Sequence, residues 1–206
     1  MRTLTAFVLS SAFCAGLFLT WAGPPLICQP YEIGNAASLP WVHSGEAGWK
    51  AGWDNPDPNY DPRHLASDTL KILDSGAPVV VRMETLRRAV IYGSRDHAAA
   101  TGLLTALRAR TDSPQAAAAA YLDYGYAVQT MRQMLWVYKE DLTKGADGRA
   151  MVEKAVAMEP DSAEMHFAAA MVARDRRLPG YDGHAAKALA ANSDALLAAN
   201  APSHLK

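Results

Sequence analysis

Cysteine is scarce in this sequence, which limits the ways in which the chain can be stabilised. Only two of the 206 residues are cysteines, Cys14 and Cys28. Cys14 lies in an apolar N-terminal stretch, so loss of that stretch would leave Cys28 alone and exclude an internal disulfide. Stability must then come from packing. The Cys28 thiol is predicted to be buried, bonded to another chain or reactive, and it is the one candidate reactive or intermolecular thiol.

The sequence also lacks an excess of charge of either sign. The formal net charge is -1 and the pI is about 6.6, whereas binding to nucleic acid or to an anionic membrane calls for a clustered basic face. We therefore expect no nucleic-acid partner. Runs of β-branched residues are scarce and alanine is abundant, and this composition favours helices.

Residues 1–22 have the composition of an export signal. Arg2 gives a positive start, residues 4–19 are mostly apolar, and Thr20 and Ala22 place small residues before Gly23. This is the pattern of a cleaved signal peptide, although the apolar stretch is also about long enough to remain as a membrane anchor over residues 4–22. We expect an exported protein, periplasmic or extracellular, that contacts a membrane only if this segment is not cleaved.

Residues 23–61 are rich in proline, glycine, asparagine and aspartate, which disfavour long regular elements. A flexible linker would be poor in aromatic residues, yet this segment contains Trp41, Trp49 and Trp53. We predict an irregular strap that inserts these three rings into a groove of the remaining chain, with a short helix near residues 34–39.

Residues 62–206 are predicted to form a helical domain of antiparallel hairpins, because apolar residues recur at helical spacing between short turns. The four-three spacing from Ala117 to Tyr138 predicts the longest helix, which Ser113-Pro114 would open. Asp161 to Glu164 resembles a capping box. Other helices are expected after Asp61, after Pro78, over residues 96–110, from Asp147 to Met158, over residues 165–175 and over residues 183–199.

The stretch E-K-A-V-A-M-E-P-D-S-A-E-M-H-F-A-A-A resembles the junction between two tetratricopeptide repeats. Ala155 and Pro160 occupy the family's small-residue and proline positions, and Gly148 occupies the earlier small position. The likeness covers residues 148–202 and implies a tetratricopeptide-like short α-solenoid there; upstream, Trp136 departs from it. The further close-packing positions that the resemblance implies are Ala169, Ala170, Ala186 and Leu189.

The strap itself resembles the segment after the leader in some uncharacterised exported bacterial proteins. The residues that carry this likeness are C-x-P-x-x-I-G-N-A-x-S-L-P-W, from Cys28 to Trp41. The resemblance implies export and membership of such a family, and it implies no activity.

No group of residues forms a recognisable catalytic or metal-binding motif. A nucleophilic cysteine needs a base, and only His43 or His64 would be available to Cys28 in space. Asp57 to Asp61, with Asp68, imitates a calcium loop, but Pro62 stands where such a loop needs glycine. Turns and helix capping explain these aspartates better, so we predict no catalytic residue, no metal ligand and no cofactor.

Two groups of arginines are candidates for binding an acidic peptide. Arg82, Arg87, Arg88 and Arg95 form one group, and Arg174, Arg176 and Arg177 form the other. We expect both to be solvated faces balanced by nearby acids.

The sequence therefore predicts an exported, non-catalytic helical protein that binds or scaffolds a protein or peptide. Two alternatives remain open. One is a membrane-anchored structural protein of the cell envelope, and the other is an enzyme that uses Cys28 or a His/Asp pair such as His64 and Asp68.

Overall fold

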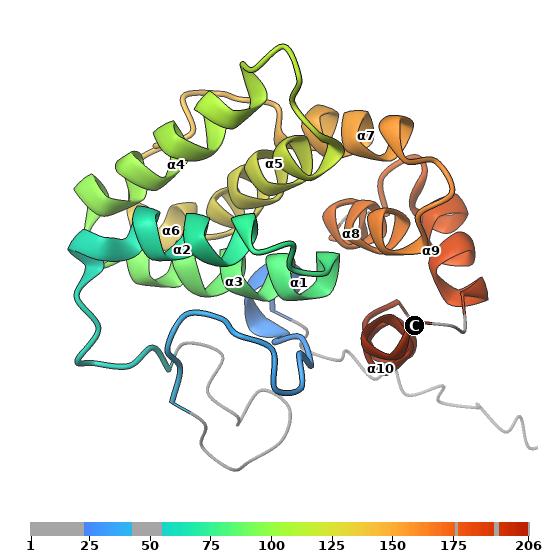
Figure 1. Ribbon diagram of the computed structural model, residues 1–206, viewed down its shortest axis with the longest axis horizontal. Helices are drawn as coiled ribbons and strands as arrows, with labels where there is room; N and C mark the ends of the chain where they lie inside the picture. The colour runs from blue at the N-terminus through green and yellow to red at the C-terminus, as the bar shows by residue number, and fades with distance from the viewer. Residues whose placement is uncertain (1–22, 43–54, 176, 192–193, 206) are drawn as a thin grey trace, which may run out of the picture.

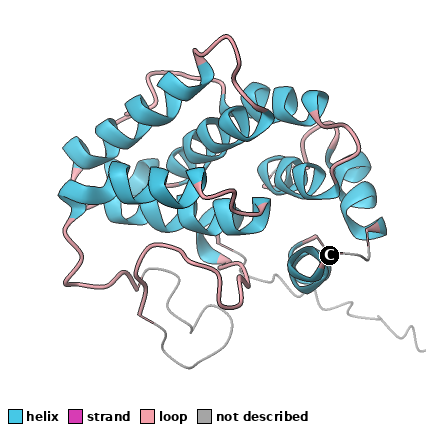
Figure 2. Cartoon of the chain, viewed as in Figure 1, coloured by secondary structure: helices cyan, strands magenta, loops and turns pink. Residues whose placement is uncertain are grey.

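The computed structural model describes residues 23–42, 55–175, 177–191 and 194–205 (Figure 1). These residues form helices and loops (Figure 2), apart from one isolated bridge between Trp41 and Pro56. The expectation of an all-α fold is confirmed. The helices are α1 (Pro25–Cys28), the 3-10 helix η2 (Pro62–His64), α2 (Leu65–Asp74), α3 (Val79–Gly93), α4 (His97–Thr111), α5 (Ala118–Gln133), α6 (Leu135–Tyr138), α7 (Gly148–Met158), α8 (Ala163–Arg174), α9 (Tyr181–Ala190) and α10 (Ala195–His204).

Side-chain caps set the start of five of these helices. Asp61 accepts a hydrogen bond from the Arg63 amide at η2, and the other four caps act in the same way at their own helices, each satisfying an amide that has no partner within its helix. Hydrogen bonds from Arg63 also lower the pKa of Asp61 to about 2. The other capping residues are Asp96 at α4, Asp147 at α7, Ser162 at α8 and Asp194 at α10.

Helix α3 lies at the centre of the fold, and each of its residues is buried. It packs against α2, α4, α5, α8 and α1. The later helices follow in sequence, with α7 on α5, α8 on α7 and α9 on α8, so they form a curved row to the right in Figure 1. Helix α10 closes the end of this row beside α8 and α9.

Helices α5 and α7 approach each other closely through two glycines. A Cβ atom at Gly148 would lie 2.5 Å from the Gly125 carbonyl oxygen, and one at Gly125 would lie 2.5 Å from the Gly148 carbonyl oxygen. Only glycine permits this backbone contact. The small residue at position 148 is therefore explained by its contact with Gly125 of α5.

The longest predicted helix is interrupted, and its predicted start is wrong. Ser113-Pro114 lies in a turn, α5 begins at Ala118, and the chain leaves the helix at Met134 before the short α6. Lys139 then adopts a φ of 62°, which ends α6. This break turns Trp136 outward, where 67% of its surface is exposed.

The last predicted helix is two helices, and its predicted inner face is also wrong. Helix α9 ends at Ala190 and α10 begins at Ala195, where Asp194 accepts a hydrogen bond from the Leu197 amide at 2.6 Å. Ala186 and Leu189 are exposed, whereas Ala185 and Ala188 are buried.

Two smaller expectations also fail. Residues 34–39 form a turn and extended chain without a helix, and the helix of this region is α1. The cap of α8 is Ser162, which accepts a hydrogen bond from the Met165 amide, and the expected pairing of residue 161 with Glu164 is not formed. Burial against α3 instead raises the pKa of Glu164.

Candidate functional site: the strap groove

Residues 24–42, the described N-terminal part of the predicted strap, pack against α3, α5, α8 and α10. The name strap refers to these residues from here on. Figure 1 shows these residues in blue beneath α3. Leu26, Ile27, Tyr31 and Leu39 are almost wholly buried and belong to the main hydrophobic core. Burying one side chain of this size contributes about 1.5–3 kcal/mol, so the strap is a substantial part of that core.

A buried carboxylate with two arginines forms the floor of this groove. The Glu84 carboxylate accepts hydrogen bonds from Arg87 (2.8 and 2.9 Å) and from Arg88 (2.7 Å), all within α3. Glu84 is 1% exposed and Arg87 is 0% exposed. Burial alone would raise the pKa of Glu84, but the two guanidinium groups outweigh it and hold this pKa below its ordinary value.

These three side chains also bind the backbone of the strap. Arg87 donates to the Ile27 carbonyl at 3.0 Å, and Arg88 donates to the Leu39 carbonyl at 2.8 Å. The Tyr31 amide donates to Glu84 at 3.1 Å. Charge-assisted hydrogen bonds of this kind are stronger than neutral ones, so the groove fixes the path of the strap through backbone groups.

Side chains from three further positions continue this pattern. The Gln133 amide oxygen accepts from the Leu26 amide at 2.8 Å, and Tyr92 donates to the Pro40 carbonyl at 2.6 Å. Asn200 of α10 makes two bonds to the backbone of Glu32, accepting from its amide at 2.9 Å and donating to its carbonyl at 2.8 Å. Four helices, α3, α5, α8 and α10, thus hold the strap, with α8 contributing Arg174 at the Gln29 side chain.

Tyr31 of the strap is buried among three other aromatic side chains. Its hydroxyl shares a hydrogen bond of 2.7 Å with that of Tyr126, and its ring stacks on His204 at 4.8 Å with Phe167 edge-on at 5.9 Å. Burial raises the pKa of both tyrosines above their ordinary value. Burial also lowers the pKa of His204.

The prediction that the arginines of α3 form a solvated face is wrong. Besides Arg87 and Arg88, Arg82 is buried and donates to both oxygens of Asp123 at 2.8 and 2.6 Å. Arg110 also donates to Asp123, at 2.7 Å, so this carboxylate joins α3, α4 and α5. Arg95 is exposed, as expected.

Only one of the three predicted strap tryptophans can be placed. The Trp41 ring meets Tyr92 edge-on at 6.1 Å and lies 5.0 Å from the Arg87 guanidinium carbon and 5.6 Å from that of Arg88. Cations over an aromatic face are attracted by the ring, so Trp41 covers the floor of the groove. Trp49 and Trp53 lie outside the described residues.

His64 and Asp68, the His/Asp pair considered for catalysis, have other partners and do not bind each other. Cys28 is half-buried at the end of α1, and His43 lies outside the described residues. His64 is exposed, and its nearest acidic oxygen is that of Asp61 at 4.0 Å, while Asp68 accepts a hydrogen bond from Tyr60 at 3.0 Å.

The aspartates of the predicted imitation calcium loop have structural partners. Asp57 accepts from the Asn59 amide at 2.8 Å, as in a turn, and Asp61 caps η2. In the part of the chain that the structure describes, no group of three or more His, Cys, Asp or Glu side chains could hold a metal ion.

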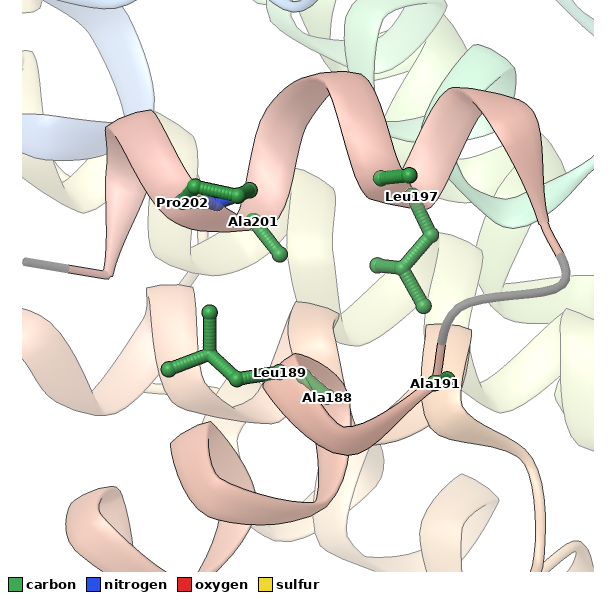
Figure 3. Close-up of a pocket in the computed structure, with 7 residues that line it drawn as sticks. Ala188, Leu189, Ala191, Leu197, Ala201 and Pro202 are labelled. Carbon is green, nitrogen blue, oxygen red and sulfur yellow. The ribbon is translucent and has the colours of Figure 1, made fainter.

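A small cavity of about 130 Å³ lies between α9 and α10. Figure 3 shows its walls of alanine, leucine and proline side chains. No polar side chain is among the residues that line this cavity. The residues that line it are Ala188, Leu189, Ala191, Leu197, Ala198, Ala201 and Pro202.

Within the described ranges, no helix has the length and apolar character needed to cross a membrane. Comparisons of the chain with family models, with curated proteins and with solved structures found no match.

Sequence reasoning missed the groove residues on α3, although a signal was present. Glu84, Arg87 and Arg88 stand three and four residues apart, which is the spacing of paired charges on one helical face. That pairing makes burial possible, because each charge then has a partner. Most of the other residues of this helix are apolar. A charged group within such a helix indicates buried, mutually paired charges more strongly than a solvated face.

Proposed function

We propose that this chain is an exported, non-catalytic helical scaffold that binds a protein or peptide on its outer surface. The observation that carries the proposal is the filled groove: side chains of α3, α5 and α10 already hold the strap through its backbone, and Arg174 of α8 binds the Gln29 side chain. A groove-bound peptide would have to displace a segment that contributes four large side chains to the core. The partner therefore binds elsewhere on the helices.

The row α7, α8 and α9 supports a tetratricopeptide-like arrangement for this scaffold. Gly148 makes the close helix contact that the family's small position provides, and Ala155, Ala169 and Ala170 are buried. Repeats of this kind stack helix pairs and bind partners over extended surfaces.

Trp136 is the residue of the outer surface to test first. It is the most exposed large apolar side chain among the described residues, and the neighbouring Leu135 is 40% exposed. Tryptophan is enriched among the residues that dominate binding energy at protein interfaces.

The experiment places a photo-crosslinking amino acid at position 136 of the full-length chain in the exporting cell. The matched control carries the same amino acid at position 158, where Met158 is exposed on α7. The proposal predicts a discrete protein adduct at position 136 that is absent at position 158. No adduct at 136, or the same adducts at both positions, would count against this surface.

One observation favours a second candidate, a membrane-anchored protein of the envelope. Pro25, Leu26 and Ile27 are already buried, directly after the segment expected to act as leader or anchor. A retained segment would therefore hold the helical body at the bilayer without a spacer. Mass spectrometry of the mature chain separates the two candidates, because a chain that begins near Gly23 cannot be anchored in this way.

A further inference from the structure

A line of hydrogen bonds crosses the contact between α7, α8 and α9, outside the strap groove. Glu153 of α7 lies 3.2 Å from Nε2 of His184 on α9, and Nδ1 of His184 lies 2.7 Å from Nδ1 of His166 on α8. The other nitrogen of His166, Nε2, lies 2.9 Å from the Pro160 carbonyl oxygen. The two imidazole rings are 5.0 Å apart between centroids.

The chemistry of the two ends assigns the protons along this line. A carbonyl oxygen only accepts, so His166 carries its proton on Nε2 and, while neutral, accepts at Nδ1. His184 must then donate from Nδ1. A carboxylate also only accepts, so the bond to Glu153 requires a proton on Nε2 of His184 as well. All three hydrogen bonds are therefore made only when His184 is an imidazolium and His166 is neutral.

We propose that His166 and His184 form a pH-dependent latch that holds α9 on α7 and α8. The latch is closed when the two histidines together carry one positive charge, with His184 as the imidazolium and His166 neutral. Removing the proton that gives this charge leaves two acceptors facing each other at either Glu153 or His166, so one bond is lost. Adding a second proton puts two N–H donors and two positive charges at the 2.7 Å contact. The latch opens on both sides of a pH window around the ordinary titration range of histidine, about pH 5 to 8.

The charged groups around the pair agree with a single added proton. On α7, Arg149 lies 3.8 Å from Glu153, and it also donates to the Pro179 carbonyl at 2.5 Å. Burial lowers the pKa of His166 and the positive charge of Lys187 on α9 lowers it further, whereas the negative charge of Glu153 on α7 raises it. His166 is buried whereas the His184 side chain keeps 14% of its surface exposed, so the charge resides on the ring nearer to solvent.

The latch controls the end of the molecule that carries α10. Helix α10 follows α9 in the chain and packs on α8 and α9, and its Asn200 holds the backbone of Glu32 in the strap. Opening the latch is thus expected to loosen α9 first and then the α10 contacts with the strap.

Nitrogen-15 NMR of the histidine rings and hydrogen exchange of the α9 amides in the full-length protein, from pH 4.5 to 8.5, test this proposal. At about pH 6.5 we expect a neutral His166 protonated at Nε2 and a doubly protonated His184. Exchange of the α9 amides should be slowest there and rise at least several-fold toward both ends of the range.

The variant Glu153→Gln keeps an oxygen acceptor and removes the charge that stabilises the imidazolium. It should move the alkaline rise in α9 exchange to lower pH. The matched control Glu140→Gln alters the exposed pair with His97 (2.6 Å) and should leave α9 unchanged. Two neutral rings at pH 6.5, an extra proton on Nδ1 of His166, α9 exchange with no minimum, or an unshifted profile in Glu153→Gln would each overturn the proposal.

Discussion

In the N-terminal half, buried charges join the strap and α2 to α5, whereas glycine and buried alanine lie where α7 packs on α5 and on α8. The buried carboxylates of Glu84 and Asp123 each bind two arginines. On the other side, Gly148 lets α7 approach α5 closely, and Ala155 of α7 and Ala170 of α8 are buried. A buried ion pair becomes strongly destabilising when one of its partners is removed, because the other charge stays buried without compensation. Close contacts of small residues fail when atoms are added.

The largest expected effect is the loss of the Glu84 carboxylate. Glu84→Ala leaves Arg87 and Arg88 without their shared counter-ion and removes the acceptor of the Tyr31 amide. We expect a loss of about 3–5 kcal/mol in the free energy of unfolding, since an uncompensated buried charge remains. Urea denaturation followed by circular dichroism measures it.

The matched control for this prediction is Glu140→Ala, which removes the exposed partner of His97. An exposed pair contributes about 0–1 kcal/mol. Equal losses for the two variants would show that burial of the Glu84 cluster does not matter to stability.

The next effect is expected in the C-terminal half, from a single added methyl group. Gly148→Ala would place its Cβ atom 2.5 Å from the Gly125 carbonyl oxygen, so α7 must move away from α5. Overpacking of this kind costs about 1–3 kcal/mol. Gly102→Ala is the control, because its Cβ meets nothing within 4 Å, and alanine there should stabilise α4 by about 0.5–1 kcal/mol. A neutral Gly148→Ala would contradict the close contact.

Acid should loosen the two halves in a fixed order. Burial lowers the pKa of His166 and of His204 below the ordinary 6.5. The unfolded chain therefore binds these protons first, and the stability that neutral histidine contributes is lost as the pH falls below about 6.5. The pKa of Glu84 is lowered from 4.5 by its arginines against the effect of burial, so its contribution disappears only below about pH 4.5.

Hydrogen exchange of the backbone amides, measured separately for each helix between pH 7 and pH 4, tests this order. Amides of α8 and α10 should lose protection before those of α3. Simultaneous loss in all three helices would mean that the two halves do not differ in their response to acid.

The smallest effect on stability is expected at the outer surface. Trp136→Ala removes a side chain that is mostly exposed and should change the free energy of unfolding by no more than about 0.5 kcal/mol. Chemical denaturation checks this value. A larger loss would place Trp136 in the structural framework and remove it as a candidate binding residue.

The helices with clear caps and regular spacing were predictable from the sequence. The apolar residues that recur at helical spacing in α4, namely Ala100, Leu103, Leu104 and Leu107, are all buried, and Asp147, a favourable N-cap residue, caps α7. These features depend on local chemistry, which the sequence contains in full.

Features that depend on distant residues were predicted less well. The burial of Arg87 follows from the Ile27 carbonyl, which lies 60 residues away in the chain. The break after α9 did have a local signal, because Asn192, Ser193 and Asp194 are cap-forming residues before Ala-Leu-Leu. The strap was expected to be held by its tryptophans, whereas in the described residues its main anchors are backbone groups, Leu26, Ile27 and Tyr31.

The free energy at which the strap amides exchange their hydrogens tests most directly whether the strap is a permanent part of the fold. Native-state exchange of the Tyr31 and Glu32 amides, bonded to Glu84 and Asn200, is compared with that of the α3 amides over a series of low denaturant concentrations. At about pH 6.5, where the latch is closed, we predict that both groups exchange only through global unfolding, with the same free energy and the same dependence on denaturant. Strap amides that exchange at a clearly lower free energy than α3 would show that the strap leaves its groove, and would contradict the placement of the partner on the outer surface.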